Sequence, residues 1–175
     1  MGVRMLSAGR MKVTLLTAKP ADPAAPTAAE LNAGLQICQN IPASEFTFGA
    51  VDSETVDSTS LCSEVKAETF GQGNYELTFG LWRKFLDAGG FDTADDATFA
   101  AVKEKGTTLW IYARFTDKKA TEVWATGDEI FLGAEFVTDT PRPVSATEGF
   151  IGYAIPTRVQ DAWPFITVGG APVSP

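Results

Sequence analysis

The stretch NYELTFGLWRKF, residues 74–85, indicates the fold of this chain more directly than any other segment. From Tyr75 to Leu81, apolar side chains occupy every second position, which is the period of a strand with one buried face. The segment EFTFGAV at 45–51 alternates in the same way, and its EFTFG nearly repeats the ELTFG of 76–80. A duplicated unit is conceivable, but we interpret the two segments as strands of one sheet.

Strand-like segments also dominate the rest of the chain. Alternating polarity or β-branched and aromatic content predicts further strands at 11–16, 107–115, 122–127, 129–139, 149–158 and 164–169. Capping-box patterns predict two helices, over roughly 28–37 after Thr27 and over 94–105 after Thr93. Together these elements predict an α+β fold that is mostly β, an antiparallel β-sandwich or open barrel with the helix 94–105 on one flank.

Composition excludes several kinds of chemistry. The 175 residues include no His, so Ser-His and Cys-His catalytic pairs and His-ligated metal sites are excluded. Phosphate-binding, dinucleotide and nucleophile-elbow motifs are missing from the sequence, and the acids of 92–96 are better explained by helix capping than by a cation. We therefore expect no catalytic residue, no cofactor and no metal. Cys38 and Cys62 are expected to be free thiols, with a disulfide as the open alternative.

The net charge of −8 is unevenly distributed. The charged residues of the segment 1–43, which sum to +2, are Arg4, Arg10, Lys12, Lys19, Asp22 and Glu30. Residues 44–175 therefore carry −10. A protein that binds nucleic acid needs a surplus of basic side chains, so this balance predicts no specific binding of DNA. Two interpretations of the basic segment stay open, a contact with the acidic body of a neighbouring copy and a solvated tail.

The sequence suggests three parts. Residues 1–43 form an N-terminal arm with a Pro/Ala connector and a short helix, residues 44–170 form a β-rich domain, and residues 171–175 form a C-terminal tail. Because residues 1–26 contain many Pro and few apolar side chains, we expect them to be mobile in the monomer and ordered against a neighbouring copy. No stretch approaches the length of a membrane-spanning helix, so we expect no membrane partner.

Three stretches carry a resemblance to a known family. They are TSLCSEVKAETFGQGNYELTFGLWRKF (59–85), GDEIFLGAEFVTDTPRPVS (127–145) and GFIGYAIPTRVQ (149–160), and FITVGG (165–170) closes the series. A polar loop leads through a Gly-containing turn into an aromatic strand that ends in Trp-Arg. A single capped helix and a run of strands follow. Over about 45–170, this order resembles the major tail tube protein of long-tailed, siphovirus-type bacteriophages.

The resemblance implies a structural virion protein with the tail tube protein fold and no enzymatic activity. Members of that family form hexameric rings with a continuous inner β-barrel, and the rings stack into the tube through which the genome passes. Other tail proteins would be partners, and the protein would be found in the virion tail and, during assembly, in the host cytoplasm. The alternative is a small β-sandwich binding or decoration domain of a virion.

The polar connection 52–74 is where the two interpretations differ. It joins two strands that we place side by side, for which about two to five residues would suffice. Its charged and apolar residues are Asp52, Glu54, Val56, Asp57, Leu61, Glu64, Val65, Lys66 and Glu68. Long loops in compact domains are usually functional or disordered. We predict that this one orders on the adjacent ring and sets the register of stacking, with a mobile surface hairpin as the alternative.

Overall fold

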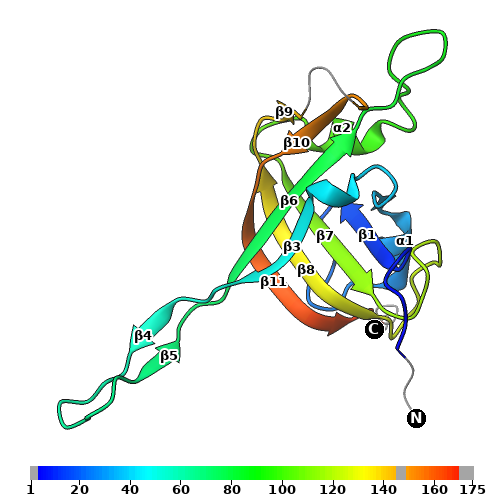
Figure 1. Cartoon of the computed structure of the whole chain (residues 1–175). Coiled ribbons are helices and arrows are strands. Elements are labelled where there is room, and N and C mark those ends of the chain that lie inside the picture. The colour runs from blue at the N-terminus through cyan, green and yellow to red at the C-terminus, as the bar shows by residue number, and fades with distance from the viewer. Residues whose placement is uncertain (1–3, 145–148, 170–175) are drawn as a thin grey trace.

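The computed structural model describes residues 4–144 and 149–169 as two antiparallel sheets packed face to face (Figure 1). The five-stranded sheet has the order β11-β8-β7-β1-β2, and the four-stranded sheet has the order β3-β6-β10-β9. A third, two-stranded sheet, β4-β5, extends away from the body. The predicted α+β, mostly β sandwich is confirmed.

The helices and strands follow one another along the chain as β1 (Met11–Leu16), α1 (Ala28–Ala33), β2 (Leu35–Gln36), the 3-10 turn η1 (Ala43–Glu45), β3 (Phe46–Val51), β4 (Thr55–Asp57), β5 (Glu68–Phe70), β6 (Asn74–Trp82), α2 (Ala97–Val102), β7 (Thr108–Phe115), β8 (Glu129–Thr138), β9 (Arg142–Pro143), β10 (Gly152–Ile155) and β11 (Thr157–Thr167). The strands predicted at 11–16, 45–51, 74–85, 107–115 and 129–139 are confirmed. The predicted strand 149–158 is divided at Pro156, which has no N–H to donate to a ladder, and 164–169 is mostly the end of β11.

Alternation along β6 builds the core between the two sheets. Leu77, Phe79 and Leu81 are at most 2% exposed, whereas the intervening Thr78 faces solvent. The ring of Phe79 meets that of Phe136 in β8 edge to face, with 6.1 Å between ring centroids. Each fully buried side chain of this kind contributes about 1.5–3 kcal/mol to folding, so one face of this short strand supplies a large part of the core.

The central strands β1, β7 and β8 of the five-stranded sheet are buried on both faces, whereas its edge strand β11 is largely exposed. Along β7, Leu109 and Ile111 face the four-stranded sheet, and Tyr112 belongs to a second apolar cluster on the opposite face with Leu31 of α1. The segment between β1 and α1 covers that face, and the Tyr112 hydroxyl donates to the Pro23 carbonyl at 3.0 Å. The four-stranded sheet is therefore the one with a face left for other uses.

Within residues 1–26, for which a mobile arm is predicted, residues 11–26 belong to the packed body, whereas residues 4–9 are exposed and residues 1–3 lie outside the described residues. β1 pairs antiparallel with β7 along its whole length, and Val13 and Leu15 are fully buried. In the connector that follows, Pro20 and Pro26 are buried as well. Sheet pairing thus crosses the boundary that the sequence suggests between residues 43 and 44. The C-terminal tail, 171–175, lies outside the described residues.

Both helices are shorter than predicted. In α1, the capping box of Thr27 and Glu30 is confirmed, but the helix ends before Gly34 rather than near residue 37. Gly34 packs so closely on β1 that a side chain there would collide with Leu16, so the chain turns away into β2. α2 covers only Ala97–Val102 of the predicted 94–105, and the predicted capping box at Thr93 is wrong. The N–H groups of Ala94 and Asp95 donate to the Asp92 carboxylate, and Asp96 binds Arg83 instead of capping the helix.

Residues 122–127 do not form the predicted strand. Arg114 in β7 is fully buried, and its guanidinium donates to the carbonyls of Lys119 at 2.9 Å and Glu122 at 3.1 Å and to the Asp128 carboxylate at 2.7 Å. Carbonyls that turn toward one central cation cannot also form a ladder with a neighbouring strand. The segment therefore wraps around Arg114 as an irregular loop.

Candidate assembly surfaces

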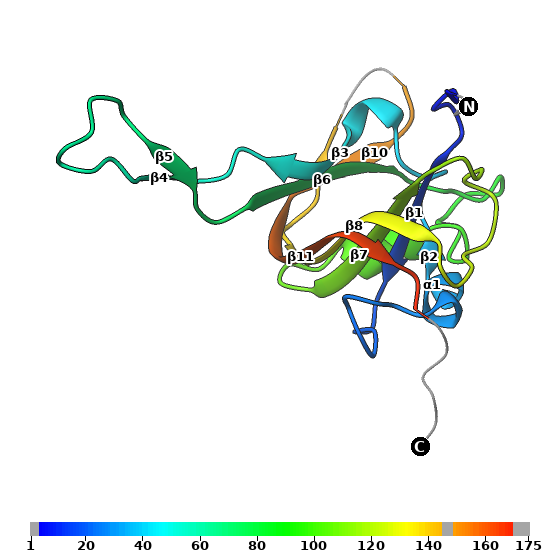
Figure 2. The ribbon, with the colours of Figure 1, turned by 90° about the horizontal axis from the view of Figure 1, so that it is seen from below.

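The connection between β3 and β6 is a hairpin that projects from the body (Figures 1 and 2). β4 and β5 pair antiparallel in it, beyond the pairing of β3 with β6. Backbone hydrogen bonds bridge the two ladders, from Glu54 N–H to the Gln72 carbonyl at 3.1 Å and from Gly71 N–H to the Glu54 carbonyl at 2.6 Å. The strands of the four-stranded sheet therefore continue into the hairpin and direct it outward.

The hairpin presents both acidic and apolar side chains to solvent. All the residues predicted to mediate stacking are exposed on it, namely Asp52, Glu54, Val56, Asp57, Leu61, Glu64, Val65, Lys66 and Glu68. Phe70 is also 82% exposed on the hairpin. The sequence prediction missed it, although it is the one aromatic residue of the polar segment 52–74. An isolated two-stranded hairpin is marginally stable in water, and exposed apolar side chains on it suit a surface that another chain completes.

The outer face of the four-stranded sheet is a second exposed surface. Glu76 and Thr78 of β6 and Thr47 of β3 point away from the core and are exposed. Gly80 continues this face, and the Glu45 carboxylate lies so close to it that a side chain at Gly80 would have no room. The strands β3, β6 and β10 contain no Lys or Arg. This face is thus lined mainly by small and polar side chains, together with two carboxylates, Arg142 of the edge strand β9 and Trp82 at the end of β6.

Both edges of the same sheet are open. Within the part of the chain that the structure describes, β3 pairs only with β6, and β9 pairs only with β10. An edge strand presents a row of unpaired backbone N–H and C=O groups, to which a strand of another chain can add. The four-stranded sheet can therefore continue into a neighbouring molecule on either side.

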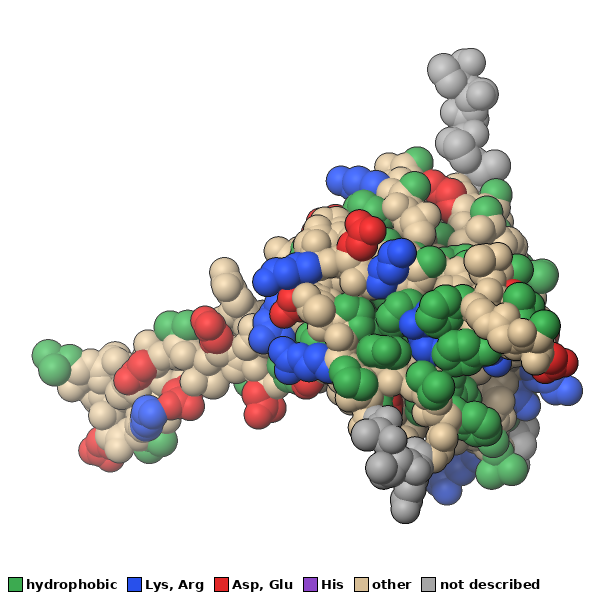
Figure 3. All heavy atoms as spheres, turned by 90° about the horizontal axis from the view of Figure 1, so that it is seen from above, with side chains coloured by type: hydrophobic (Ala, Val, Ile, Leu, Met, Phe, Trp, Pro, Cys, Tyr) green, Lys and Arg blue, Asp and Glu red, His purple; other side chains and the backbone are tan. Residues whose placement is uncertain are grey.

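A third surface lies at the end of β6 opposite the hairpin, where apolar side chains gather in Figure 3. The loop that follows β6 exposes Phe85, Leu86 and Phe91, each by about half. Arg83 holds this loop, because its guanidinium binds the Asp96 carboxylate at 2.7 Å and lies 4.2 Å from the centroid of Phe91. The molecule thus carries exposed apolar side chains at both ends of one strand.

The four basic residues of the predicted arm contact differ in their availability. Lys12 is 4% exposed, and its Nζ donates to the Ala120 carbonyl at 3.1 Å. Burial, with a contribution from nearby Arg114, lowers the pKa of Lys12. Arg4 and Lys19 are exposed and Arg10 is half-buried. Lys12 is therefore not available to a neighbouring copy, and a contact by the other three stays a prediction.

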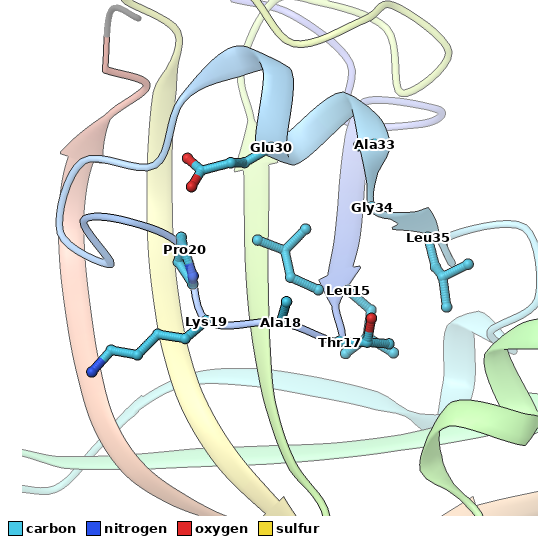
Figure 4. A pocket seen from close by; sticks show the side chains of 10 residues that line it. Leu15, Thr17, Ala18, Lys19, Pro20, Glu30, Ala33, Gly34 and Leu35 are labelled. Carbon is cyan, nitrogen blue, oxygen red and sulfur yellow. The ribbon is translucent and has the colours of Figure 1, made fainter. Parts of the chain in front are cut away.

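A hollow of about 390 Å³ lies between the end of β1 and α1 (Figure 4). The Glu30 carboxylate at this hollow accepts hydrogen bonds from the backbone N–H groups of Ala21 and Thr27, both at 2.8 Å, and from the Thr27 hydroxyl at 2.7 Å. Burial alone would raise the pKa of Glu30, but these hydrogen bonds lower it. The carboxylate is thus engaged in holding the connector to the helix.

Other functional groups are sparse in the described part of the chain. It contains no cluster of three or more His, Cys, Asp or Glu side chains that could hold a metal ion. Cys38, half-buried in the body, and Cys62, exposed in the hairpin, are both free thiols. None of the helices in the described ranges has the length and apolar character needed to cross a bilayer.

Fold and surfaces together define a β-sandwich protein whose exposed features are a hairpin, an open-edged sheet and an apolar end. Residues 1–171 match the family described as phage tail tube protein, and the chain belongs to that family. A search of curated proteins found no match. The family is structural rather than enzymatic, and membership places the protein in a bacteriophage virion, in the tail, where it assembles with other tail components into a tube. The resemblance inferred from the sequence is confirmed.

Proposed function

We propose that this protein assembles with itself into hexameric rings that stack into the tail tube, the conduit for the genome. The observation that carries the proposal is the four-stranded sheet with two open edges. If β3 of each subunit meets β9 of the next, six sheets close into one continuous inner barrel without a free edge. Closed rings with such head-to-tail contacts are a common solution for symmetric assemblies.

In this arrangement the outer face of the four-stranded sheet lines the lumen. Most of its side chains are small or polar, and Glu45 and Glu76 outnumber Arg142 of β9, so the wall carries net negative charge. The hairpin projects beyond the sheet along the direction of β3 and β6, so it reaches the adjacent ring (Figure 2). During assembly the protein is in the host cytoplasm.

Electron microscopy of the purified protein tests this proposal. We expect six-fold rings or tubes in negatively stained preparations at micromolar concentration, and a species of six subunits or larger in sedimentation velocity. A protein that stays monomeric over the whole concentration range contradicts the proposal. That result would favour the alternative drawn from the sequence, a decoration or binding domain of the virion.

The assembled tube is expected not to retain duplex DNA. Binding to phosphates requires Lys and Arg, and the strands of the four-stranded sheet supply only Arg142 of β9 to the proposed lumen, where Glu45 and Glu76 outnumber it. A gel-shift titration at about 0.15 M salt should show no shift with micromolar wild-type protein.

The matched variant for this measurement is Glu76→Lys/Thr78→Lys, which places two cations per subunit on the same exposed face. It should retard DNA, and raising the salt concentration should abolish the effect. Salt-dependent binding by the wild-type protein would contradict an electrostatically inert lumen.

A further inference from the structure

A groove of about 570 Å³ lies where β8 ends and β11 begins. Val137 and Pro156 contribute apolar wall, and the charged residues that line the groove are Lys105, Asp139, Arg142 and Arg158. The charged lining therefore sums to +2, in a part of the chain that carries −10. Lys and Arg side chains gather on the body near the root of the hairpin in Figure 3. The groove is thus a basic site with apolar walls on an otherwise acidic protein.

The groove does not neutralise its own charge. Asp139 lies 3.5 Å from Lys105, and its carboxylate also accepts a hydrogen bond from the Thr140 N–H at 2.8 Å. That hydrogen bond, together with Lys105 and Arg142, lowers the pKa of Asp139, so the carboxylate stays ionised at neutral pH. One carboxylate nevertheless faces three cations. A ligand that complements the groove therefore carries negative charge on an apolar framework.

The hairpin of a second copy has that composition. Residues 52–74 contain five acids and one Lys, and Leu61 and Phe70 are among their exposed apolar side chains. The hairpin of the same copy does not occupy the groove, because the hydrogen bonds that continue the β3–β6 ribbon direct it away from the body. A neighbouring molecule is the remaining source of this acidic segment.

We propose that the basic groove lined by Lys105, Arg142 and Arg158 is the docking site for the acidic hairpin of a subunit in the adjacent ring. The inference rests on the proposed stacking of rings and adds the surface that receives the hairpin. Charge complementarity at such a contact speeds association and rejects wrong registers. Because each ring presents six copies of the pair, modest individual contacts combine into strong stacking that weakens as salt increases.

A charge swap tests the pairing directly. Lys105→Glu/Arg158→Glu reverses the groove without touching the edge strand β9, and Glu54→Lys/Glu64→Lys reverses the hairpin at two exposed positions. Each reversal alone should lower the fraction of protein in tubes at least tenfold while single rings persist. All four substitutions in one chain restore opposite charges at every ring-to-ring contact, so tubes should return. Lys119→Glu, an exposed reversal outside the groove, should assemble like the wild type.

The outcomes separate this inference from the proposed function. If the wild type forms tubes and the groove reversal forms them equally well, the groove assignment is wrong and stacking stands. If each reversal alone abolishes stacking and the combined variant also fails to stack, the two surfaces do not pair. If the wild type forms neither rings nor tubes, both the proposed function and this inference are wrong. If duplex DNA binds the wild type and the groove reversal abolishes that binding, the groove serves phosphates instead.

Discussion

Replacing residues 54–72 by a Gly-Ser turn is expected to yield a folded protein that no longer forms tubes. Every residue from Glu54 to Gln72 is exposed, so the deletion removes nothing from either apolar cluster. The pairing of β3 with β6 runs from Phe46 opposite Phe79 to Val51 opposite Asn74, and it lies wholly outside the deleted segment. Circular dichroism and the Tm should therefore match those of the wild type, while electron microscopy shows at most single rings.

A milder variant distinguishes the loss of apolar contacts made by the hairpin from the shortening of the hairpin itself. Leu61→Ser/Phe70→Ser keeps the hairpin backbone and its charges but removes two of its exposed apolar side chains. Burying each of them against a neighbour would contribute about 1.5–3 kcal/mol, so this variant should need a much higher protein concentration to form tubes. Normal tubes from the shortened protein, or failure of its monomer to fold, would show that the hairpin does not have the role assigned to it.

Much of the architecture is predictable because strand periodicity is a local property. In β6, the alternation of Tyr75, Leu77, Phe79 and Leu81 is sufficient to predict both the strand and its buried face. The long polar connection is equally visible, since two adjacent strands do not require 52–74 to join them. The open edges of the four-stranded sheet are not visible, because they depend on which strands pair.

What the sequence did not reveal depends on partners far along the chain. β1 belongs to the core because β7, about a hundred residues later, pairs with it, and the Pro-rich connector between β1 and α1 conceals that relation. The basic groove also depends on residues that are far apart in the sequence. Lys105, Arg142 and Arg158 stand in three separate segments, and no spacing rule predicts that the end of β8 and the start of β11 bring them together.

The irregular loop 116–128 shows a third reason for error, a buried charge that overrides local preference. The aromatic and β-branched residues of 122–127 favour a strand, yet Arg114 is 0% exposed and donates hydrogen bonds to the Glu122 and Val123 carbonyls of this segment. Leaving a buried guanidinium without acceptors costs more than an unformed strand, so the loop adopts the conformation that surrounds it. The ring of Trp124 also lies 5.1 Å from the guanidinium carbon.

Asp128→Asn is expected to lower the free energy of unfolding by about 3–5 kcal/mol, the usual consequence of removing one partner of a buried ion pair. Asp128 binds both Arg114, at 2.7 Å, and Lys118, and Lys12 is buried nearby. Without the carboxylate, this part of the core holds cations with no anion beside them. For a domain of this size, the change corresponds to a fall in Tm on the order of 10 °C.

The pH dependence of the unfolding free energy tests whether the Asp128 carboxylate causes this loss of stability. Burial alone would raise the pKa of Asp128, but hydrogen bonds from Lys118, the Ala125 N–H and Arg114 lower it below the ordinary value. A carboxyl whose pKa is lower in the folded state stabilises the protein above its unfolded pKa of about 3.9 and loses that effect as the pH falls through the folded value. The stability gap between the wild type and Asp128→Asn should therefore be constant from pH 7 to about pH 5 and narrow below pH 4.

Asp139→Asn is the matched control for Asp128→Asn. Asp139 also pairs with a lysine, at 3.5 Å from Lys105, but both side chains are exposed by nearly half or more. Exposed ion pairs contribute about 0–1 kcal/mol, so this substitution should change the Tm by no more than a few degrees. Urea unfolding of the three proteins at pH 7 measures the difference. Equal losses from the two substitutions would mean that Asp128 contributes no more than a surface charge and that the loop 116–128 is held by other contacts.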